Sequence, residues 1–204
     1  LAPYLREYLR GELKEWCKNN QEADGSNYNL YTDGLKIYTT INSKMQRYAE
    51  EAVHSHIASL QNDFFKHWKG YTNAPFPKDF DKEQIYSILE QGMKRSDRYK
   101  KLKSRNASKK EINSAFRTKT PMRVFTWKGE RDTIMTPLDS VRYYKYFIHS
   151  GMMSMDPNTG YVKAYVGGIN YKYFKYDHVK VGKRQVGSTF KPFLYALAIQ
   201  EGYS

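Results

Sequence analysis

The chain has 204 residues, of which 40% are hydrophobic and 16% aromatic, and this composition excludes an intrinsically disordered protein. Cys17 is the single cysteine, which excludes an intrachain disulfide framework and a thiolate zinc cluster. The sequence contains no run of about 18 apolar residues, so it predicts no membrane span. The net charge of +13 indicates an anionic partner such as nucleic acid, lipid headgroups or an acidic polymer.

The first 41 residues predict a helix, a loop and a strand. Residues 2–18 have apolar side chains near helical spacing, and Pro3 suits the first turn of a helix. Residues 19–29 are polar and contain a glycine, so they predict a loop. Residues 35–41 alternate between apolar and polar and predict a strand. One face of that strand is formed by Leu35, Ile37, Thr39 and Ile41.

A long helix is predicted from Ser43 to about Trp68, with Asn42 as its N-cap. Its apolar stripe is expected to face the core. The stripe consists of Met45, Ala49, Ala52, Val53, Ile57, Leu60, Phe64 and Trp68. His54 and His56 stand two residues apart and therefore point to different faces, which favours surface or core-edge histidines over a zinc site. We expect no metal and no cofactor.

Two capping boxes divide the central part of the chain. A loop is predicted for residues 70–80, and Asp81 with Gln84 then begins a helix. Ser108 with Glu111 begins a second one, so part of the intervening sequence is helical. The first helix is expected to bury Ile85, Ile88, Leu89 and Met93, and the second Ile112, Ala115 and Phe116.

The positive charge is concentrated in residues 94–119, which hold eleven Lys or Arg and two Asp or Glu, a net charge of 11 − 2 = +9. Three interpretations are open: a solvated surface insertion, a contact with anionic lipid or polymer, and a nucleic-acid patch. The chain carries no signature of a nucleic-acid-binding fold. We therefore expect no nucleic acid as a partner.

Two hairpins and a short helix are predicted in the following part. A strand over residues 122–127, a turn at 128–129 and a return over 132–135 precede a helix that Thr136 caps. That helix is expected to bury Val141, Tyr144, Phe147 and Ile148. A second hairpin pairs residues 151–156 with 161–168 around a Pro-Asn-Thr-Gly turn. Its inward face is expected to consist of Met153, Met155, Val162, Ala164 and Val166.

A Tyr- and Lys-rich loop over residues 169–184 leads to the motif Gly187-Ser188-Thr189-Phe190-Lys191. Residues three apart share a helix face, so the Ser188 hydroxyl and the Lys191 amine can point into one pocket. A serine needs such a base to act as a nucleophile, and lysine serves as one only when burial or nearby cations lower its pKa from about 10.4. The apolar residues 190–199 predict a buried helix around that lysine. The alternative is a buried helix with a capping serine and a snorkelling lysine.

The segment 184–193 resembles the nucleophile motif of the class A penicillin-binding proteins, the bifunctional cell-wall synthases. Val186 is a departure, because the family often has proline there. Further resemblances follow in the family's order: residues 2–9, residues 33–46, residues 123–144 and the hairpin at 151–168.

The resemblance implies an α+β fold in three parts. Residues 1–30 would connect to a preceding glycosyltransferase domain. Residues 31–148 would form a linker or pedestal region with a basic helical insertion at about 70–120. Residues 149–204 would begin an incomplete transpeptidase domain of the penicillin-binding and serine β-lactamase type, with its first strands and nucleophile helix. Since the chain opens with Leu1 rather than methionine, we expect it to be part of a longer protein.

The resemblance implies that Ser188 is the nucleophile and Lys191 the general base of a D,D-transpeptidase that cross-links peptidoglycan stem peptides and is acylated by β-lactams. It also implies a location on the outer face of the cytoplasmic membrane, anchored by an N-terminal helix outside this chain. The family's later Ser-x-Asn and Lys-Thr-Gly motifs do not follow Ser188, and Ser104-Arg105-Asn106 precedes it. The chain by itself is therefore expected to be inactive. The alternative is a non-catalytic basic module that binds a partner protein, or that binds wall polymer or anionic lipid through residues 94–119.

Overall fold

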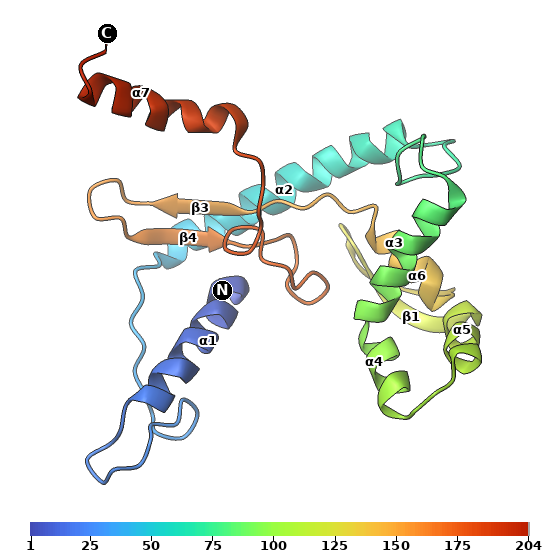
Figure 1. Ribbon diagram of the computed structural model, residues 1–204, viewed down its shortest axis with the longest axis horizontal. Helices are drawn as coiled ribbons and strands as arrows, with labels where there is room; N and C mark the ends of the chain where they lie inside the picture. Colours follow the sequence, from blue (N-terminus) through green and yellow to red (C-terminus); the bar gives the residue numbers. More distant parts are fainter. Residues whose placement is uncertain (204) are drawn as a thin grey trace. The chain divides into compact units, whose positions relative to one another are not determined.

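The computed structural model describes residues 1–203 and has an α+β fold of helices and short antiparallel strands, as the sequence predicts (Figure 1). The chain divides into two compact units. The first consists of residues 1–46 together with 151–204, and the second consists of residues 47–150. The division of the sequence into three parts stays a prediction. Within residues 1–203, no helix combines the length and the apolar character needed to span a membrane.

The first unit contains α1 (Pro3–Asn19), the hairpin of β3 (Met152–Met155) and β4 (Val162–Val166), the 3₁₀ turn η1 (Gly187–Phe190) and α7 (Lys191–Gln200). The long helix α2 (Ser43–His67) begins at the end of this unit's first segment. Its N-cap is confirmed, because the Asn42 side-chain oxygen accepts hydrogen bonds of 3.0 Å from the backbone N–H groups of Lys44 and Met45.

The strand predicted over residues 35–41 does not form, so this prediction is wrong. The segment has no regular ladder and meets β4 only at its end. There the Thr40 hydroxyl donates to the Val162 carbonyl at 2.8 Å, and the Asn42 N–H donates to the Lys163 carbonyl at 2.9 Å. The alternation itself is real, because Ile37, Thr39 and Ile41 all line one pocket beside α1. Alternation predicts which side chains share a face of the segment. A β-strand also requires backbone hydrogen bonds to a neighbouring strand along its whole length.

The buried face of α2 is only partly the predicted apolar stripe. Ala49, Val53 and Ile57 are buried as expected, whereas Met45 and Leu60 are exposed. Two glutamines, Gln46 and Gln61, are instead completely buried on this helix. Hydropathy does not predict the burial of these glutamines, because a polar amide is buried only where specific hydrogen-bond partners satisfy it.

The second unit contains most of α2, then three consecutive helices, a hairpin and a short helix. The elements after α2 are α3 (Lys82–Arg95), α4 (Asp97–Ser104), α5 (Lys109–Arg117), β1 (Thr120–Thr126), β2 (Gly129–Met135) and α6 (Pro137–Tyr144). Both predicted capping boxes are confirmed, at Asp81 and at Ser108. The Thr136 cap of α6 is confirmed as well, with Asp139 N–H donating to the Thr136 hydroxyl at 3.0 Å.

Two small apolar clusters hold these helices. The first joins Ile85 and Leu89 of α3 to Phe76 and to Val141 of α6. The second consists of Met93, Ile112 and Phe116, with Tyr99, Leu102 and Ala107 packed against it. The basic segment is therefore folded around a core that α3 and α5 share, since Met93 comes from α3 and the other two buried residues from α5.

The β3–β4 hairpin forms as predicted, with a register irregularity between Ser154 and Met155. Its predicted inward face is only partly correct. Ala164 and Val166 are buried, but Met153 and Met155 are about half exposed, and Tyr165 is buried on the opposite face of β4. A two-stranded sheet has two edge strands, and the methionines lie on the strand that the described part of the chain leaves uncovered.

Candidate functional site

The Ser188 motif stands at the start of the last helix. Gly187 has a φ of +52°, a left-handed conformation that favours glycine, and the chain then enters η1. Lys191 begins α7, and its backbone N–H donates to the Ser188 carbonyl. Ser188 and Lys191 are therefore about one helical turn apart at the start of α7, and their predicted roles stay a prediction. The backbone N–H groups at this helix start are the type of donor that stabilises a developing oxyanion.

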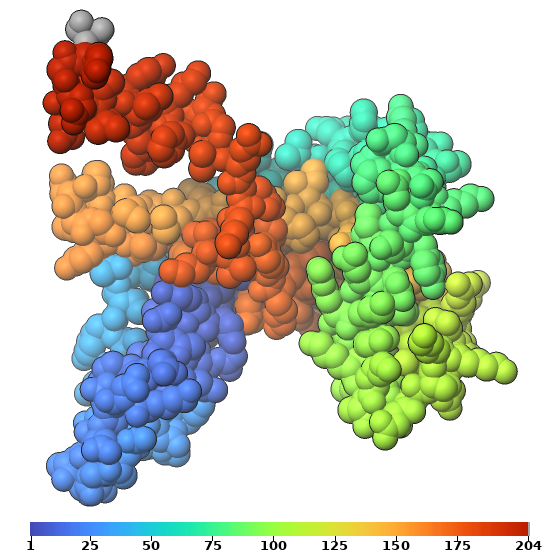
Figure 2. All heavy atoms as spheres, in the orientation of Figure 1, coloured from blue at the N-terminus to red at the C-terminus, as the bar shows by residue number. Residues whose placement is uncertain are grey.

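The predicted burial of this helix is not observed. The large apolar side chains of α7 are between 53% and 71% exposed, and Ser188 and Lys191 are exposed too (Figure 2). These apolar residues are Phe193, Leu194, Tyr195, Leu197 and Ile199. The predicted burial of α7 is therefore wrong within residues 1–203, whereas the roles of Ser188 and Lys191 stay a prediction. An apolar sequence predicts burial only where other chain segments supply the covering surface.

The structure brings Ser188 and Lys191 to one helix start without joining them. Over the described residues, no hydrogen bond links their side chains. The neighbouring hydrogen bond is that of the Thr189 hydroxyl, which donates to the Val186 carbonyl and so closes the turn before the helix. The pair has the spacing for proton transfer from a serine to a lysine, and the water-excluded surroundings that would activate it are not formed by this part of the chain.

The loop that leads to Ser188 is held by Asp177. One carboxylate oxygen accepts a hydrogen bond from the Tyr165 hydroxyl at 2.7 Å, and the other accepts from the Val179 and Lys180 N–H groups at 2.9 and 3.2 Å. Burial, with Asp177 as the next cause, raises the pKa of Tyr165, so its hydroxyl remains a donor to this carboxylate. Asp177 thereby ties the turn that follows it to strand β4.

His178 lies in the same turn and is also anchored through its backbone. Its N–H donates to the Gly167 carbonyl at 2.7 Å, and its ring packs edge-on against Tyr176 at 4.9 Å. Burial and the nearby Arg184 guanidinium lower the pKa of His178, while Asp177 opposes them. The neutral imidazole is therefore favoured in the folded chain.

Two residues that position this region were missed by the sequence predictions. The Gln46 amide donates to the Tyr165 carbonyl at 2.9 Å and accepts from the Tyr165 N–H at 2.7 Å, so it pairs with β4 as another strand would. Tyr4 is 3% exposed and donates to the Phe174 carbonyl at 2.6 Å. The Gly167-Gly168 pair was the available signal for Tyr4, since adjacent glycines after a strand permit close approach of another group.

The histidines of α2 form no metal site. His54 is exposed and packs edge-on against Trp127 at 5.3 Å, in keeping with the predicted surface or core-edge position. Across residues 1–203, no three His, Cys, Asp or Glu side chains are grouped so that they could hold a metal ion.

The basic segment presents its charges to solvent. Helix α4 has no buried residue. Of the eleven cationic residues in 94–119, Lys94 is the one that takes part in an ion pair among the described residues, with Glu90 at 3.0 Å. One of the two acidic residues, Glu111, accepts hydrogen bonds from Ser108 in the capping box, which lower its pKa. The positive charge of this segment is therefore mostly uncompensated locally.

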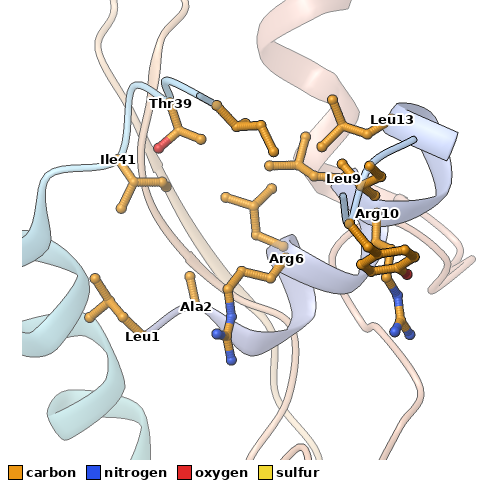
Figure 3. A pocket seen from close by; sticks show the side chains of 12 residues that line it. Leu1, Ala2, Arg6, Leu9, Arg10, Leu13, Thr39 and Ile41 are labelled. Carbon is orange, nitrogen blue, oxygen red and sulfur yellow. The ribbon is translucent and has the colours of Figure 1, made fainter. Parts of the chain in front are cut away.

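A pocket of about 540 Å³ lies between α1 and the extended segment 37–41 (Figure 3). Leu9 and Leu13 of α1 face Thr39 and Ile41 across it, and Arg6 and Arg10 stand at its edge. The lining is mostly apolar, and its polar side chains include no carboxylate or histidine to serve as a general base. It is a packing feature of the first unit rather than a catalytic site.

Comparisons with known proteins found one matching family model and several similar relatives. Residues 71–148 match the penicillin-binding protein middle domain, and this range includes the basic segment. Over 98% of its length the chain is similar to penicillin-binding protein 1A of Escherichia coli K12 (23% identity), of Rickettsia typhi (26%) and of Neisseria lactamica (26%).

The matched region is a limited part of those relatives. The chain spans about a quarter of their length, 26% in the first two and 27% in the third. No solved structure matches it significantly. The chain is therefore similar over nearly its whole length to penicillin-binding proteins 1A, and its residues 71–148 match the middle domain of penicillin-binding proteins.

Proposed function

We propose that this chain is part of a bifunctional peptidoglycan synthase and carries the nucleophile and the general base of its D,D-transpeptidase. The observation that carries the proposal is the Ser188-x-x-Lys191 motif at the start of α7, in a chain related end to end to penicillin-binding proteins 1A. Peptidoglycan synthesis in general is supported by these relatives. The assignment of the two residues rests on the motif and its position on the helix.

The proposed chemistry is acyl transfer. The Ser188 hydroxyl attacks the carbonyl between the two terminal D-alanines of a stem peptide, and Lys191 accepts its proton. Collapse of the tetrahedral intermediate breaks the peptide bond, and the departing D-alanine takes up a proton at its amine. An amine of a second stem peptide then attacks the Ser188 ester, forms the cross-link and restores the hydroxyl. A β-lactam would acylate the same oxygen by opening its ring.

The decisive experiment uses the full-length protein that contains this chain. Ser188→Ala should abolish both labelling by a fluorescent penicillin and transpeptidation, and Ser154→Ala, on β3, should leave both intact. Lys191→Ala should reduce acylation by about 10²–10⁴-fold, the usual contribution of a general base. Labelling of the Ser188→Ala protein at the wild-type rate would refute the nucleophile assignment.

We further propose that the 204-residue chain by itself does not turn over substrate. No Ser-x-Asn or Lys-Thr-Gly motif follows Ser188 in it, and the described part of the chain leaves Ser188 and Lys191 exposed to water. Penicillin labelling of this chain that depends on Ser188 would contradict the proposal. We also propose that the whole protein lies on the outer face of the cytoplasmic membrane, held there by an N-terminal anchor helix that is not part of this chain.

A second, non-catalytic function is proposed for residues 94–119, namely binding to an anionic membrane surface or wall polymer. The local excess of exposed cations favours it. Reversing three exposed charges on α4 (Lys100, Lys101 and Lys103 to Glu) should weaken binding to anionic vesicles or purified peptidoglycan and flatten its salt dependence.

The matched control for this test reverses three exposed lysines outside the segment, Lys36, Lys69 and Lys82. Both variants have the same net charge, so an equal loss of binding in both would show a non-specific charge effect and remove the proposal. No binding to either surface at low salt would remove it as well. A gel shift with generic DNA and RNA tests the expectation that nucleic acid is not a partner.

A further inference from the structure

The ring of Tyr4 occupies space that side chains would otherwise fill at the end of β4. Tyr4 lies in the first turn of α1 and is 3% exposed. A Cβ atom on Gly167 would fall 2.6 Å from Tyr4 Cγ, and one on Gly168 would fall 2.4 Å from Tyr4 Oη. Both distances are far below van der Waals contact. The two glycines are therefore the positions at which α1 and the end of β4 meet directly.

Helix α1 also contacts the loop that runs from these glycines toward Ser188. The Tyr4 hydroxyl donates to the Phe174 carbonyl at 2.6 Å, and its ring packs edge-on against Tyr171 at 4.9 Å. One helical turn further along α1, the Tyr8 ring lies 4.8 Å from the Lys180 amine. Burial raises the pKa of Tyr4, so the hydroxyl stays a donor. The helix thus holds the loop at several separate points.

The same loop is fixed from its other side. Asp177 connects the Tyr165 hydroxyl to the N–H groups of the following turn, as described above. The turn then closes tightly, because a Cβ on Gly182 would lie 2.7 Å from the His178 carbonyl oxygen. The chain leaves this anchored turn only a few residues before Gly187 and Ser188. All of these contacts lie within the unit formed by residues 1–46 and 151–204.

We propose that Tyr4 is a positioning residue for the nucleophile segment. By fixing the end of β4 and the loop over residues 168–182, it sets the point from which the Ser188 turn departs. The inference rests on the proposed role of Ser188. A positioning role differs from a purely stabilising role in one measurable way. Removing the contacts of Tyr4 should slow acylation in molecules that remain fully folded.

The test uses the full-length protein and a fluorescent penicillin, with acylation resolved into the dissociation constant and the rate constant of the covalent step. Tyr4→Phe keeps the ring and removes the hydrogen bond to Phe174. We expect a covalent step slower by on the order of 10-fold, because small displacements of a nucleophile have large effects on rate. The dissociation constant and the labelled fraction at completion should not change. Tyr38→Phe, at a tyrosine that is 89% exposed, is the matched control and should have the wild-type rate.

A double substitution separates positioning from folding. Gly168→Ala places a methyl group 2.4 Å from the Tyr4 hydroxyl oxygen and 2.8 Å from Tyr4 Cζ, and it should slow the covalent step. Adding Tyr4→Phe removes the closer of these two contacts. Coupling between the two sites predicts that the double variant is faster than the product of the single effects, as in a double-mutant cycle. Independent effects, or a loss of labelled fraction with a normal rate, would overturn the positioning role.

The outcomes also distinguish this inference from the proposed function. If Ser188→Ala still becomes labelled at the normal rate, the nucleophile assignment fails and the role of Tyr4 fails with it. If Ser188→Ala is unlabelled and Tyr4→Phe reacts at the wild-type rate, the nucleophile assignment stands and the positioning role alone is refuted.

Discussion

The buried side chain of Gln61 makes two hydrogen bonds to the backbone of residues 146–148, which pairs with no strand in the described part of the chain. Its amide donates to the Tyr146 carbonyl at 2.8 Å and accepts from the Ile148 N–H at 2.8 Å, and the side chain is completely buried. Gln61→Leu keeps a similar volume but leaves both backbone groups without these partners. We expect the free energy of unfolding to fall by about 2–4 kcal/mol, the cost of orphaned buried polar groups, measured by urea denaturation.

The neighbouring Asn62 offers a control for that substitution. Asn62 is exposed on the same helix, so Asn62→Leu makes a similar chemical change without touching the buried pair. It should alter stability by no more than about 0.5 kcal/mol. Equal effects of the two substitutions would mean that the Gln61 hydrogen bonds do not stabilise this segment.

His178 predicts a pH dependence of stability. Burial and Arg184 lower its pKa in the folded chain, so the unfolded chain binds more protons. The contribution of this residue is therefore complete above the unfolded pKa of about 6.5 and is lost as the pH falls from there through the folded pKa. The negative charge of Asp177 favours the protonated imidazole and so moderates the effect. We expect the urea midpoint to fall between about pH 8 and pH 5.

The contribution of His178 can be isolated by comparison with His56, an exposed histidine of α2. His178→Gln should flatten the pH dependence, and His56→Gln should leave the slope unchanged. A slope that is the same in the wild type and in the His178→Gln protein would show that this group does not couple folding to pH.

At the level of elements, helices α3 and α6 pack so closely that a side chain at Gly92 would contact Val141 too tightly. A Cβ on Gly92 of α3 would lie 2.6 Å from a methyl carbon of Val141 on α6. Alanine improves helix propensity by about 0.5–1 kcal/mol, whereas overpacking costs about 1–3 kcal/mol. Because the β-branched valine is stiff, we expect overpacking to win and Gly92→Ala to destabilise the unit. Thermal unfolding would measure it.

Two further variants make the Gly92 prediction specific. Gly11 lies within α1 and has no atom within 4 Å of where its Cβ would be, so Gly11→Ala should stabilise the chain through propensity alone. Adding Val141→Ala to Gly92→Ala should remove the clash, so the two effects should not be additive. Additive losses would show that the helices do not meet at this point.

For the whole molecule, the exposed apolar side chains of α7 predict behaviour in solution. A contiguous apolar surface of this kind favours association and dye binding. We expect the 204-residue chain to bind an apolar fluorescent dye and to self-associate with increasing concentration. Phe193→Ser combined with Leu197→Ser should lower the dye signal by roughly half. Sedimentation would follow the self-association.

Ile134 on β2 provides the control for α7, because it is 68% exposed and lies outside that helix. Ile134→Ser should change the dye signal little. If it lowers the signal as much as the α7 substitutions, the binding surface is not α7.

The local signals in the sequence predicted most of the elements. Caps at Asn42, Asp81, Ser108 and Thr136 all form, because a side chain that satisfies a helix-end N–H acts over three residues and needs no tertiary partner. The turn of the second hairpin forms for the same reason. The candidate pair Ser188 and Lys191 was visible too, since its spacing along a helix is a local property.

What the sequence alone determined is therefore the order of the elements, their caps and the spacing of the candidate pair. The tertiary structure decided which residues are buried. It buried the polar Gln46 and Gln61, left the apolar α7 exposed, and kept residues 35–41 without a strand partner. It also brought Tyr4 against Gly168, far away in the sequence. The physical reason is that burial and backbone pairing depend on surfaces supplied by distant segments, whereas caps and turns depend on neighbours only a few residues away.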